Sequence, residues 1–372
     1  MTPPEGRHIR CRLRWILLTY LFSWVLRSTL AHRDNHAVIL SSSRYWFNYR
    51  HTINALSIYN LLKENGYSDD NIVLMLADEY ASNPRNPFPD RLLARGKQGP
   101  SLYDGQSTEI DYRGSDVTVQ NLVRVLTGRQ VGGLPTLQST NESNVLIYIT
   151  GHGGDQFFKF QDVEEILASD IAHALEQMEY EHVLFLADTC QAFTLGDKIT
   201  APNVTFVGSS LRGESSYAHH SDADLGLSII ERYTYSLTEY LHNRRPYGQS
   251  LQQVLIDPHD YAQQRAHISY KDDTSVRKMT EIPVSDCFVA KQATSEKPAR
   301  PVVIAENEGL LFSSGSWLDS FPDPVLVLED DLSDESTMVQ DEPVTAYHGS
   351  DLYFYALATT LVVTITVTSH FI

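Results

Sequence analysis

Two apolar runs decide the fold expected for this chain: NVLIYIT at residues 144–150, followed by GHGG at 151–154, and HVLFLAD at residues 182–188, followed by TCQA at 189–192. Each run has the length of a buried β-strand and an apolar interior. Each is followed, two residues later, by a reactive side chain. These side chains are the imidazole of His152 and the thiol of Cys190.

The same pattern extends over residues 37 to 290. Further strands are predicted at AVIL (37–40), IVLML (72–76) and VTFVG (204–208). Apolar residues at helical spacing between the strands predict helices within 53–62, 119–126 and 171–178, and a longer helix over 227–241. Apolar strands that alternate with helices predict an α/β domain over residues 32–290, with a mostly parallel sheet covered by helices on both faces.

In such sheets, functional sites form at the carboxyl ends of the strands. His152 and Cys190 would therefore lie on one edge and, if their strands are neighbours, about 5 Å apart in strand spacing. The alternative is coincidence, because buried cysteines and hydrogen-bonded histidines are common in protein cores. Two reactive residues at equivalent positions favour a paired site.

The pair suits nucleophilic catalysis, because a neighbouring imidazole increases the thiolate fraction of a cysteine. The backbone N–H groups of Gly153 and Cys190 are predicted to form an oxyanion hole. For Asp188, two residues before the nucleophile, a catalytic and a structural role both remain open. The other two cysteines are Cys11 and Cys287, and a disulfide between Cys190 and Cys287 is an alternative in an oxidising compartment.

The two ends of the chain have a different composition. Residues 1–31 place several arginines before the apolar run 15–26 and small residues at 29 and 31, which predicts a cleaved secretory signal. A signal anchor is the alternative. Residues 291–351 are acidic and predict a flexible lumenal stalk. Residues 352–372 carry no formal charge and predict a transmembrane anchor, with a tail exchanged for a lipid as the alternative.

The overall charge is strongly negative, with 47 acidic and 29 basic residues and a net charge of −18. Clustered basic residues, which nucleic-acid binding requires, are not apparent, so nucleic acid is not an expected partner. Asn141 and Asn203 begin glycosylation sequons, and Asn141 is favoured because it lies in a polar stretch.

Five stretches resemble the legumain family of caspase-like cysteine peptidases, and within it the branch that attaches glycosylphosphatidylinositol (GPI) anchors. The resemblance covers residues 36–290. It implies a caspase-like α/β fold, Cys190 as nucleophile, His152 as base and Asn48 as the residue that orients the imidazole. The stretches are SRYWFNYRH (43–51), IYITGHGGD (147–155), FKFQDVEEI (158–166), LADTCQA (186–192) and YAHHSD (217–222).

The resemblance also implies a structural calcium site that the chemistry does not require. Its ligands would be Asp69, the carbonyl of Ile72, Glu109 and Asp111, and oxygen donors of this kind suit a hard cation. The family often has a cysteine bonded to a partner subunit where this chain has Ser82. We therefore expect that contact to be non-covalent.

Three further residues, Arg50, Ser209 and Ser210, are expected to line the substrate pocket. The adjacent His219 and His220 are assigned to the rim of the groove, because no matching zinc ligands accompany them.

The resemblance implies acyl transfer. Cys190 would cleave the C-terminal signal of a proprotein through a thioester, and the ethanolamine amine of a GPI lipid would accept the acyl group. The implied partners are the other membrane subunits of the transamidase complex, proprotein signal peptides and the GPI lipid. The implied location is the endoplasmic reticulum membrane, with a single span and a lumenal catalytic domain. A legumain-like lumenal endopeptidase and a non-catalytic membrane adaptor are the alternatives.

Overall fold

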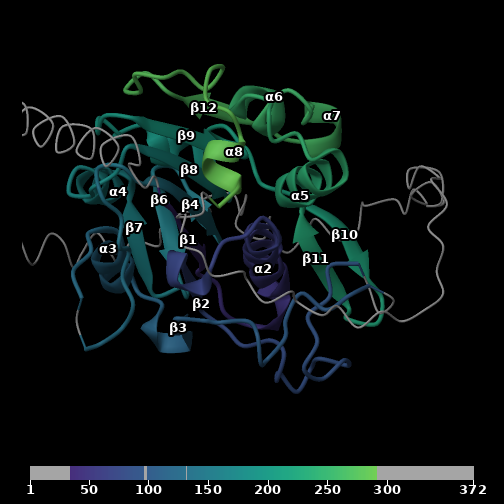
Figure 1. Ribbon diagram of the computed structural model, residues 1–372. Helices are drawn as coiled ribbons and strands as arrows, with labels where there is room; N and C mark the ends of the chain where they lie inside the picture. Colours follow the sequence, from purple (N-terminus) through teal and green to yellow (C-terminus); the bar gives the residue numbers. More distant parts are fainter. Residues whose placement is uncertain (1–33, 96–98, 131, 291–372) are drawn as a thin grey trace, which may run out of the picture. The chain divides into compact units, whose positions relative to one another are not determined.

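The computed structural model describes residues 34–95, 99–130 and 132–290. A seven-stranded sheet with the order β12-β9-β8-β4-β1-β2-β3 forms the centre of this part of the chain (Figure 1). All its neighbouring strands are parallel except β12, which pairs antiparallel with β9. The strands are β1 (Asn35–Ser41), β2 (Ile72–Leu76), β3 (Tyr112–Arg113), β4 (Asn144–Thr150), β8 (His182–Asp188), β9 (Val204–Gly208) and β12 (Ser269–Lys271).

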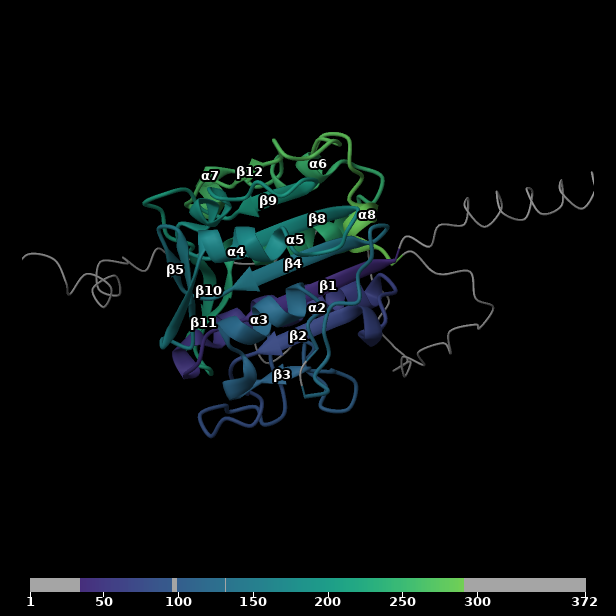
Figure 2. The ribbon, with the colours of Figure 1, turned by 90° about the vertical axis from the view of Figure 1, so that its left-hand side faces the viewer.

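Helices cover both faces of this sheet. In Figure 2, α3 and α4 lie over the face turned to the viewer, whereas α2 and α5 pack against the opposite face. The helices are α2 (Tyr49–Glu64), α3 (Val119–Leu126), α4 (Ala168–Leu175), α5 (Arg232–Arg244), α6 (Leu251–Leu255), α7 (Tyr261–Gln264) and α8 (Ser285–Phe288). Short 3₁₀ turns complete the set at η1 (Trp46–Asn48), η2 (Asp69–Asn71), η3 (Gly114–Asp116) and η4 (Ala192–Gly196).

The core consists of two apolar clusters separated by the sheet. In β1, Ala37 and Ile39 belong to the cluster under α2, whereas Val38 and Leu40 belong to the cluster under α3 and α4. Because successive side chains of a strand point to opposite faces, a strand buried on both faces must be apolar throughout. This confirms the predicted mostly parallel sheet covered on both faces.

The five predicted strands of the central sheet are confirmed, and β2, β4, β8 and β9 have the predicted bounds. Two smaller sheets were not predicted. One is formed by β5 (Gly153–Gly154), β6 (Phe157–Phe160) and β7 (Glu164–Leu167), and the other by β10 (Ala218–Asp222) and β11 (Leu227–Glu231).

The long helix predicted over 227–241 is wrong in its first part. Residues Leu227–Glu231 form β11, which pairs antiparallel with β10, and α5 begins only at Arg232. The spacing of three between Leu227 and Ile230 does not by itself define a helix. The adjacent Ile229 and Ile230 are β-branched, which favours a strand, and both are buried in the core cluster under α2.

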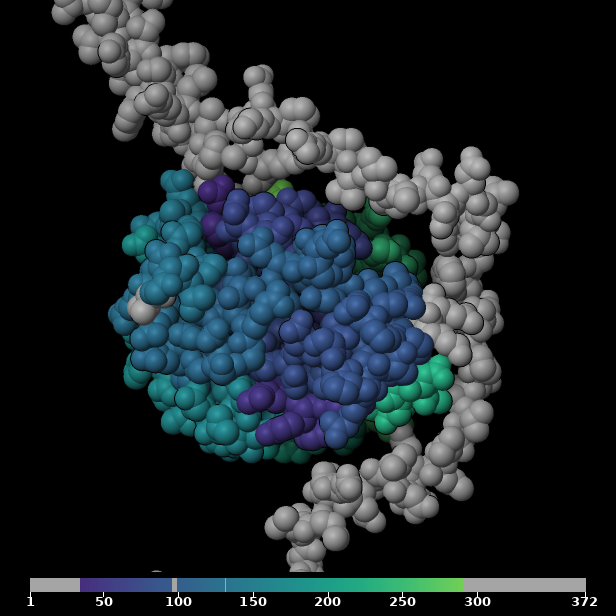
Figure 3. All heavy atoms as spheres, turned by 90° about the horizontal axis from the view of Figure 1, so that it is seen from below, coloured from purple at the N-terminus to yellow at the C-terminus, as the bar shows by residue number. Residues whose placement is uncertain are grey.

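Figure 3 shows the molecule from below the view of Figure 1, on the side where β2 and β3 lie. Purple and blue segments from the first half of the domain build most of this face.

The predicted signal (1–31), stalk (291–351) and transmembrane anchor (352–372) lie outside the described residues. Among the described residues, no helix combines the length and the apolar character that a membrane crossing needs.

Truncation of Leu184 tests the packing of the central sheet. This side chain is fully buried in β8, between β4 and β9. Leu184→Ala should lower the free energy of unfolding by about 2–5 kcal/mol, because it removes apolar contacts and leaves a cavity. Thermal unfolding measures the effect. Val276→Ala is the control, since Val276 is 85% exposed, and equal melting temperatures for the two variants would contradict the assigned core.

Candidate active site

The pairing of β4 with β8 brings His152 and Cys190 to one edge of the sheet. The two strands are parallel neighbours, and their last residues, Thr150 and Asp188, are directly paired. His152 and Cys190 each follow two residues later, so both side chains leave the sheet at the same level. The expected adjacency of their strands is confirmed.

Asn48 fixes the orientation of the His152 ring. The amide nitrogen of Asn48 donates to the Arg44 carbonyl at 2.7 Å, and its Oδ1 lies 2.8 Å from His152 Nε2. A carbonyl only accepts, so the Arg44 contact determines which end of the Asn48 amide faces the imidazole. His152 Nε2 must therefore carry the hydrogen, which leaves Nδ1 as the basic nitrogen.

The environment of His152 favours the neutral imidazole. Burial, followed by the positive charge of Arg50, lowers the pKa of His152 below its ordinary value. The ring of the buried His51 packs edge-on against it, with centroids 5.1 Å apart. A neutral imidazole with a free Nδ1 is the form that accepts a proton from a thiol.

Cys190 is a half-buried free thiol at the start of a tight turn. Gln191 adopts a left-handed conformation with φ 52°, and its backbone N–H donates to the Glu214 carbonyl at 2.9 Å. Burial raises the pKa of the Cys190 thiol, an effect that the Ser216 backbone and the Ser215 side chain partly offset. The thiol is therefore protonated at rest and depends on a base for activation.

The backbone around Gly153 suits the predicted oxyanion hole. Gly153 and Phe158 are paired across β5 and β6, and Lys159 N–H donates to the His152 carbonyl at 2.9 Å. This pattern makes Gly153 a non-hydrogen-bonded position, so its own N–H points away from β6. A Cβ on Gly153 would lie 2.6 Å from Thr189 Oγ1, so the close approach of the two loops requires glycine.

The three predicted pocket residues differ in their surroundings. Arg50 Nε forms a 2.8 Å ion pair with Glu231 beside the dyad, and its side chain is partly exposed. Ser209 and Ser210 are buried. The Ser210 hydroxyl donates to the Thr189 carbonyl at 2.8 Å and accepts from Ala192 N–H at 3.1 Å, so it braces the nucleophile turn. A substrate role for these residues stays a prediction.

Sequence reasoning missed Glu231 as a member of the site. Its side chain is 4% exposed and contacts both Arg50 and His51, with 3.3 Å to His51 Nε2. Its backbone N–H donates to Asn54 Oδ1, and the Asn54 amide in turn donates to the Thr150 hydroxyl at the end of β4. An acidic residue between a strand and a helix could have indicated this role. The prediction of one long helix over 227–241 hid that junction.

The residues of the implied calcium site lie beside the first half of β2, where Asp69 precedes the strand and Asp111 bonds to Leu74. Tyr59 OH donates to Asp69 Oδ1 at 2.6 Å and accepts from Glu109 N–H at 3.3 Å. Burial first, and then the charges of Glu109 and Asp69, raise the pKa of Asp111 to about 6. Within the described ranges, however, no group of three or more His, Cys, Asp or Glu side chains is arranged to hold a metal.

Lys63 already neutralises one of these carboxylates, because its Nζ lies 2.6 Å from the other Asp69 oxygen. The donors match a hard cation in their chemistry.

Other predicted features can now be placed. Cys287 lies in the core, with its sulfur 4.0 Å from His182 Nδ1, and it forms no disulfide with Cys190, so the disulfide alternative is wrong. His219 and His220 are neighbours on β10, and their rings pack edge-on. The His219 ring also stacks on Tyr235 of α5, with ring centroids 4.0 Å apart.

The loop and sequon residues are also visible. Ser82 and Asn141 are exposed. Asn203 has its Oδ1 bonded to Val276 N–H, and its sequon threonine, Thr205, is buried in β9. A non-covalent partner contact at Ser82 and glycosylation at Asn141 stay predictions.

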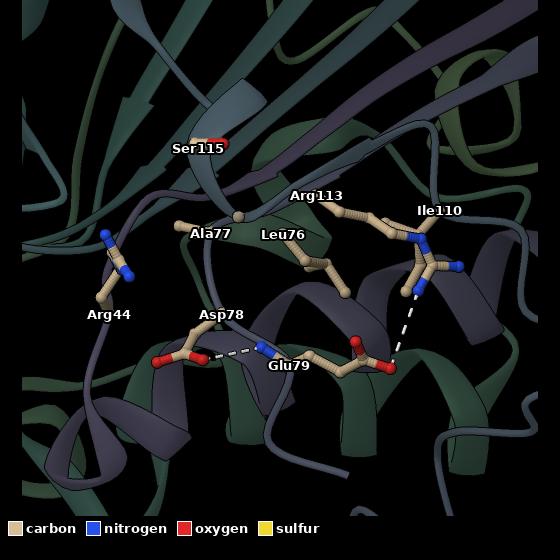
Figure 4. Close-up of a pocket in the computed structure, with 9 residues that line it drawn as sticks. Arg44, Leu76, Ala77, Asp78, Glu79, Ile110, Arg113 and Ser115 are labelled. Carbon is tan, nitrogen blue, oxygen red and sulfur yellow. Dashed lines mark hydrogen bonds and ion pairs between the residues drawn. The ribbon is translucent and has the colours of Figure 1, made fainter. Parts of the chain in front are cut away.

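A cavity in the described structure lies elsewhere on the same edge of the sheet. It measures about 310 Å³ and opens where β2 and β3 end. Figure 4 shows Arg44 beside Asp78 at one side and Arg113 reaching toward Glu79 at the other. The predicted dyad does not line it, so we assign the active site from the strand geometry and the hydrogen bonds rather than from cavity size.

A cysteine and a histidine beyond the ends of adjacent parallel strands, with an asparagine that fixes the imidazole, define a cysteine peptidase-like enzyme. Residues 35–291 match the model of the peptidase C13 family, and the chain belongs to this family.

Individual proteins are similar over much of their length. The GPI-anchor transamidase of Saccharomyces cerevisiae is 39% identical over 307 residues, which cover 78% of this chain and 74% of that protein. The putative GPI-anchor transamidase of Drosophila melanogaster is 40% identical over 80% of this chain and 85% of that protein. The human GPI-anchor transamidase is 44% identical over 59% of this chain and 57% of that protein.

Among solved structures, caspase-1 from Spodoptera frugiperda matches with a TM-score of 0.41 and 11% identity, covering 70% of this chain and 92% of that chain.

Replacement of Asn48 by aspartate tests the assigned tautomer. A carboxylate at His152 Nε2 would stabilise the imidazolium and raise the pKa of His152 by about one unit or more. Because the base is lost as pH falls through that pKa, the acidic limb of the pH–rate profile should move to higher pH. Asn243→Asp, at an exposed position of α5, is the control. An unchanged profile in Asn48→Asp would contradict the contact.

Proposed function

We propose that this chain is the catalytic subunit of a GPI-anchor transamidase. The proposal rests above all on the placement of an intact Cys190 and His152 beyond β4 and β8, in a chain whose relatives bear that name. A non-catalytic adaptor would have no need for a base with its tautomer fixed and a free thiol on the same edge.

In the first half of the reaction, His152 Nδ1 takes the proton of the Cys190 thiol, and the sulfur attacks a carbonyl near the C-terminus of a proprotein. The N–H groups of Gly153 and Cys190 stabilise the negative charge on the oxygen, each contributing about 3 kcal/mol. His152 then gives its proton to the leaving amine. The C-terminal signal departs and a thioester remains on Cys190.

In the second half, the ethanolamine amine of a GPI lipid attacks the thioester, and His152 accepts a proton from that amine. The C–S bond breaks, an amide forms and the proton returns to the thiolate. Water is the competing nucleophile. Amide formation therefore requires the amine to be held near the thioester, which raises its effective concentration.

The same proposal includes the setting of the enzyme. Partner membrane subunits would present the lipid and collect the proprotein signal, and Arg50, Ser209 and Ser210 would line the pocket for the scissile residue. Residues 1–31 would direct the chain to the endoplasmic reticulum, 291–351 would form the stalk, and 352–372 would be a single membrane anchor with the catalytic domain in the lumen.

The acceptor separates a transamidase from a legumain-like endopeptidase. A thioester on Cys190 should react with small strong amines, because a neutral amine is a better nucleophile than water. Membranes that contain this protein should release proprotein signals and couple the new C-terminus to added hydrazine, as measured by mass spectrometry. Cys190→Ala should abolish both products, whereas Cys287→Ser should retain them. A C-terminus that remains mostly free acid in millimolar hydrazine would favour the endopeptidase.

We also propose that a calcium ion binds Asp69, the carbonyl of Ile72, Glu109 and Asp111 and displaces Lys63 from Asp69. Support comes from the mutual repulsion of these carboxylates, which a cation would relieve.

Calcium at a hundredfold excess over its dissociation constant should stabilise the wild-type protein by about 2.7 kcal/mol. Asp111→Asn should abolish this gain, because the neutral amide contributes no charge to the site. The amide oxygen can still accept from Leu74 N–H, so the fold should be retained. Thermal unfolding with calcium or with a chelator measures it, and Asp90→Asn, at an exposed loop position, is the control. Identical melting of the wild type under both conditions would argue against the site.

A further inference from the structure

Asp188 ends β8 as a buried carboxylate with no part in the reaction steps described above. It is 1% exposed. Its Oδ1 accepts from the Ser216 hydroxyl at 2.8 Å, and its Oδ2 accepts from the Thr234 hydroxyl at 2.6 Å and from Thr234 N–H at 3.3 Å. A buried carboxylate is costly unless it is hydrogen-bonded, so this position calls for a physical reason.

The first reason lies in the segment that Asp188 holds. Gln191 N–H donates to the Glu214 carbonyl at 2.9 Å, and Gly213 N–H donates to Gln191 Oε1 at 2.9 Å. The segment 213–216 is therefore bonded from both sides of the nucleophile, by Gln191 one residue after Cys190 and by Asp188 two residues before it. These contacts of Gln191 and Asp188 set the distance between residues 213–216 and the sulfur.

The second reason lies in what anchors Asp188. Thr234 belongs to α5, and its hydroxyl donates to Asp188, so the contact of 2.5 Å between Tyr148 OH and Thr234 Oγ1 must have the tyrosine as donor. Tyr148 lies in β4, the strand that leads to His152. The Asp188 carboxylate at the end of β8 therefore connects β4, through Thr234 of α5, to Ser216.

We propose that Asp188 is a positioning residue that holds Ser216, and with it the backbone of residues 215–216, against the Cys190 thiol. The inference rests on Cys190 being the nucleophile of the proposed function. The Ser216 backbone and the Ser215 side chain act on the thiol and favour its ionised form. Loss of the Asp188–Ser216 bond should therefore leave a less reactive sulfur.

The test uses the rate at which iodoacetamide alkylates Cys190 in the full-length protein at neutral pH, followed by mass spectrometry of the Cys190 peptide. This readout reports the thiol itself and does not depend on which acyl acceptor the enzyme uses. Ser216→Ala should slow alkylation about tenfold, the equivalent of about 1.4 kcal/mol, without a matching fall in melting temperature. Ser216→Thr keeps a hydroxyl and should restore most of the rate.

A double-mutant cycle makes the link to Asp188 specific. Asp188→Asn should also slow alkylation about tenfold, and the double variant with Ser216→Ala should be no slower than either single one, because both act through one bond. Ser221→Ala is the control, since its hydroxyl is exposed and contacts Ser228 on the neighbouring strand. If Asp188→Asn does not fold, the comparison of Ser216→Ala with Ser216→Thr decides.

The proposal is overturned by alkylation of Ser216→Ala at the wild-type rate, or by losses that multiply in the double variant. Slow alkylation in Ser216→Ala together with an equal loss in Ser221→Ala would also overturn it. If alkylation slows as expected but hydrazine is not coupled to proproteins, the positioning role of Asp188 stands and the transamidase assignment fails.

Discussion

The parallel pairing of β4 with β8 is the constraint on which the site depends. Its register places Thr150 opposite Asp188, and the reactive residues follow two positions later on each chain. A slip of one residue would move every side chain of one strand to the other face of the sheet. Because both faces pack against helices, such a slip would put side chains of the wrong size and shape into both apolar clusters. The packing of the core therefore fixes the alignment of the dyad.

Behind the dyad, buried polar side chains connect the sheet to the helices of one face. Asn54 of α2 bonds both the Thr150 hydroxyl and the backbone of Glu231. Glu231 then contacts Arg50 and His51 of α2, which begins directly after Asn48. Hydrogen bonds in a low-dielectric interior are strong when satisfied and costly when broken. This network makes the position of the imidazole a property of the folded domain rather than of one loop.

The thiol and the imidazole are both held in their neutral forms at rest. Burial raises the pKa of Cys190 and lowers the pKa of His152. Both shifts have one physical cause, since burial penalises whichever form carries a charge. Donors that act on the sulfur, such as the Ser216 backbone, oppose this effect and favour the ionised thiol. The position of residues 213–216 therefore affects the ionisation of the Cys190 thiol as well as the packing of the site.

Strand prediction succeeded where apolar runs were long and continuous. The bounds of β2, β4, β8 and β9 follow directly from the sequence, because burial on both faces leaves little freedom in composition. It failed for β10 and β11, a two-stranded ribbon of mixed composition in which β10 is partly exposed and β11 ends in the core, and for the two-residue β3 and β5. Such elements depend on cross-strand partners that local periodicity does not specify.

The sequence by itself pointed to the candidate catalytic residues, because a thiol and an imidazole that follow two apolar strands can be recognised without a structure. It also determined the class of fold. The tertiary structure alone decided that β4 and β8 are neighbours, which tautomer His152 adopts, that Glu231 belongs to the site, and that Asp188 reaches Ser216. These contacts join residues 28 to 181 positions apart, and a periodicity read along the chain contains no information on such pairs.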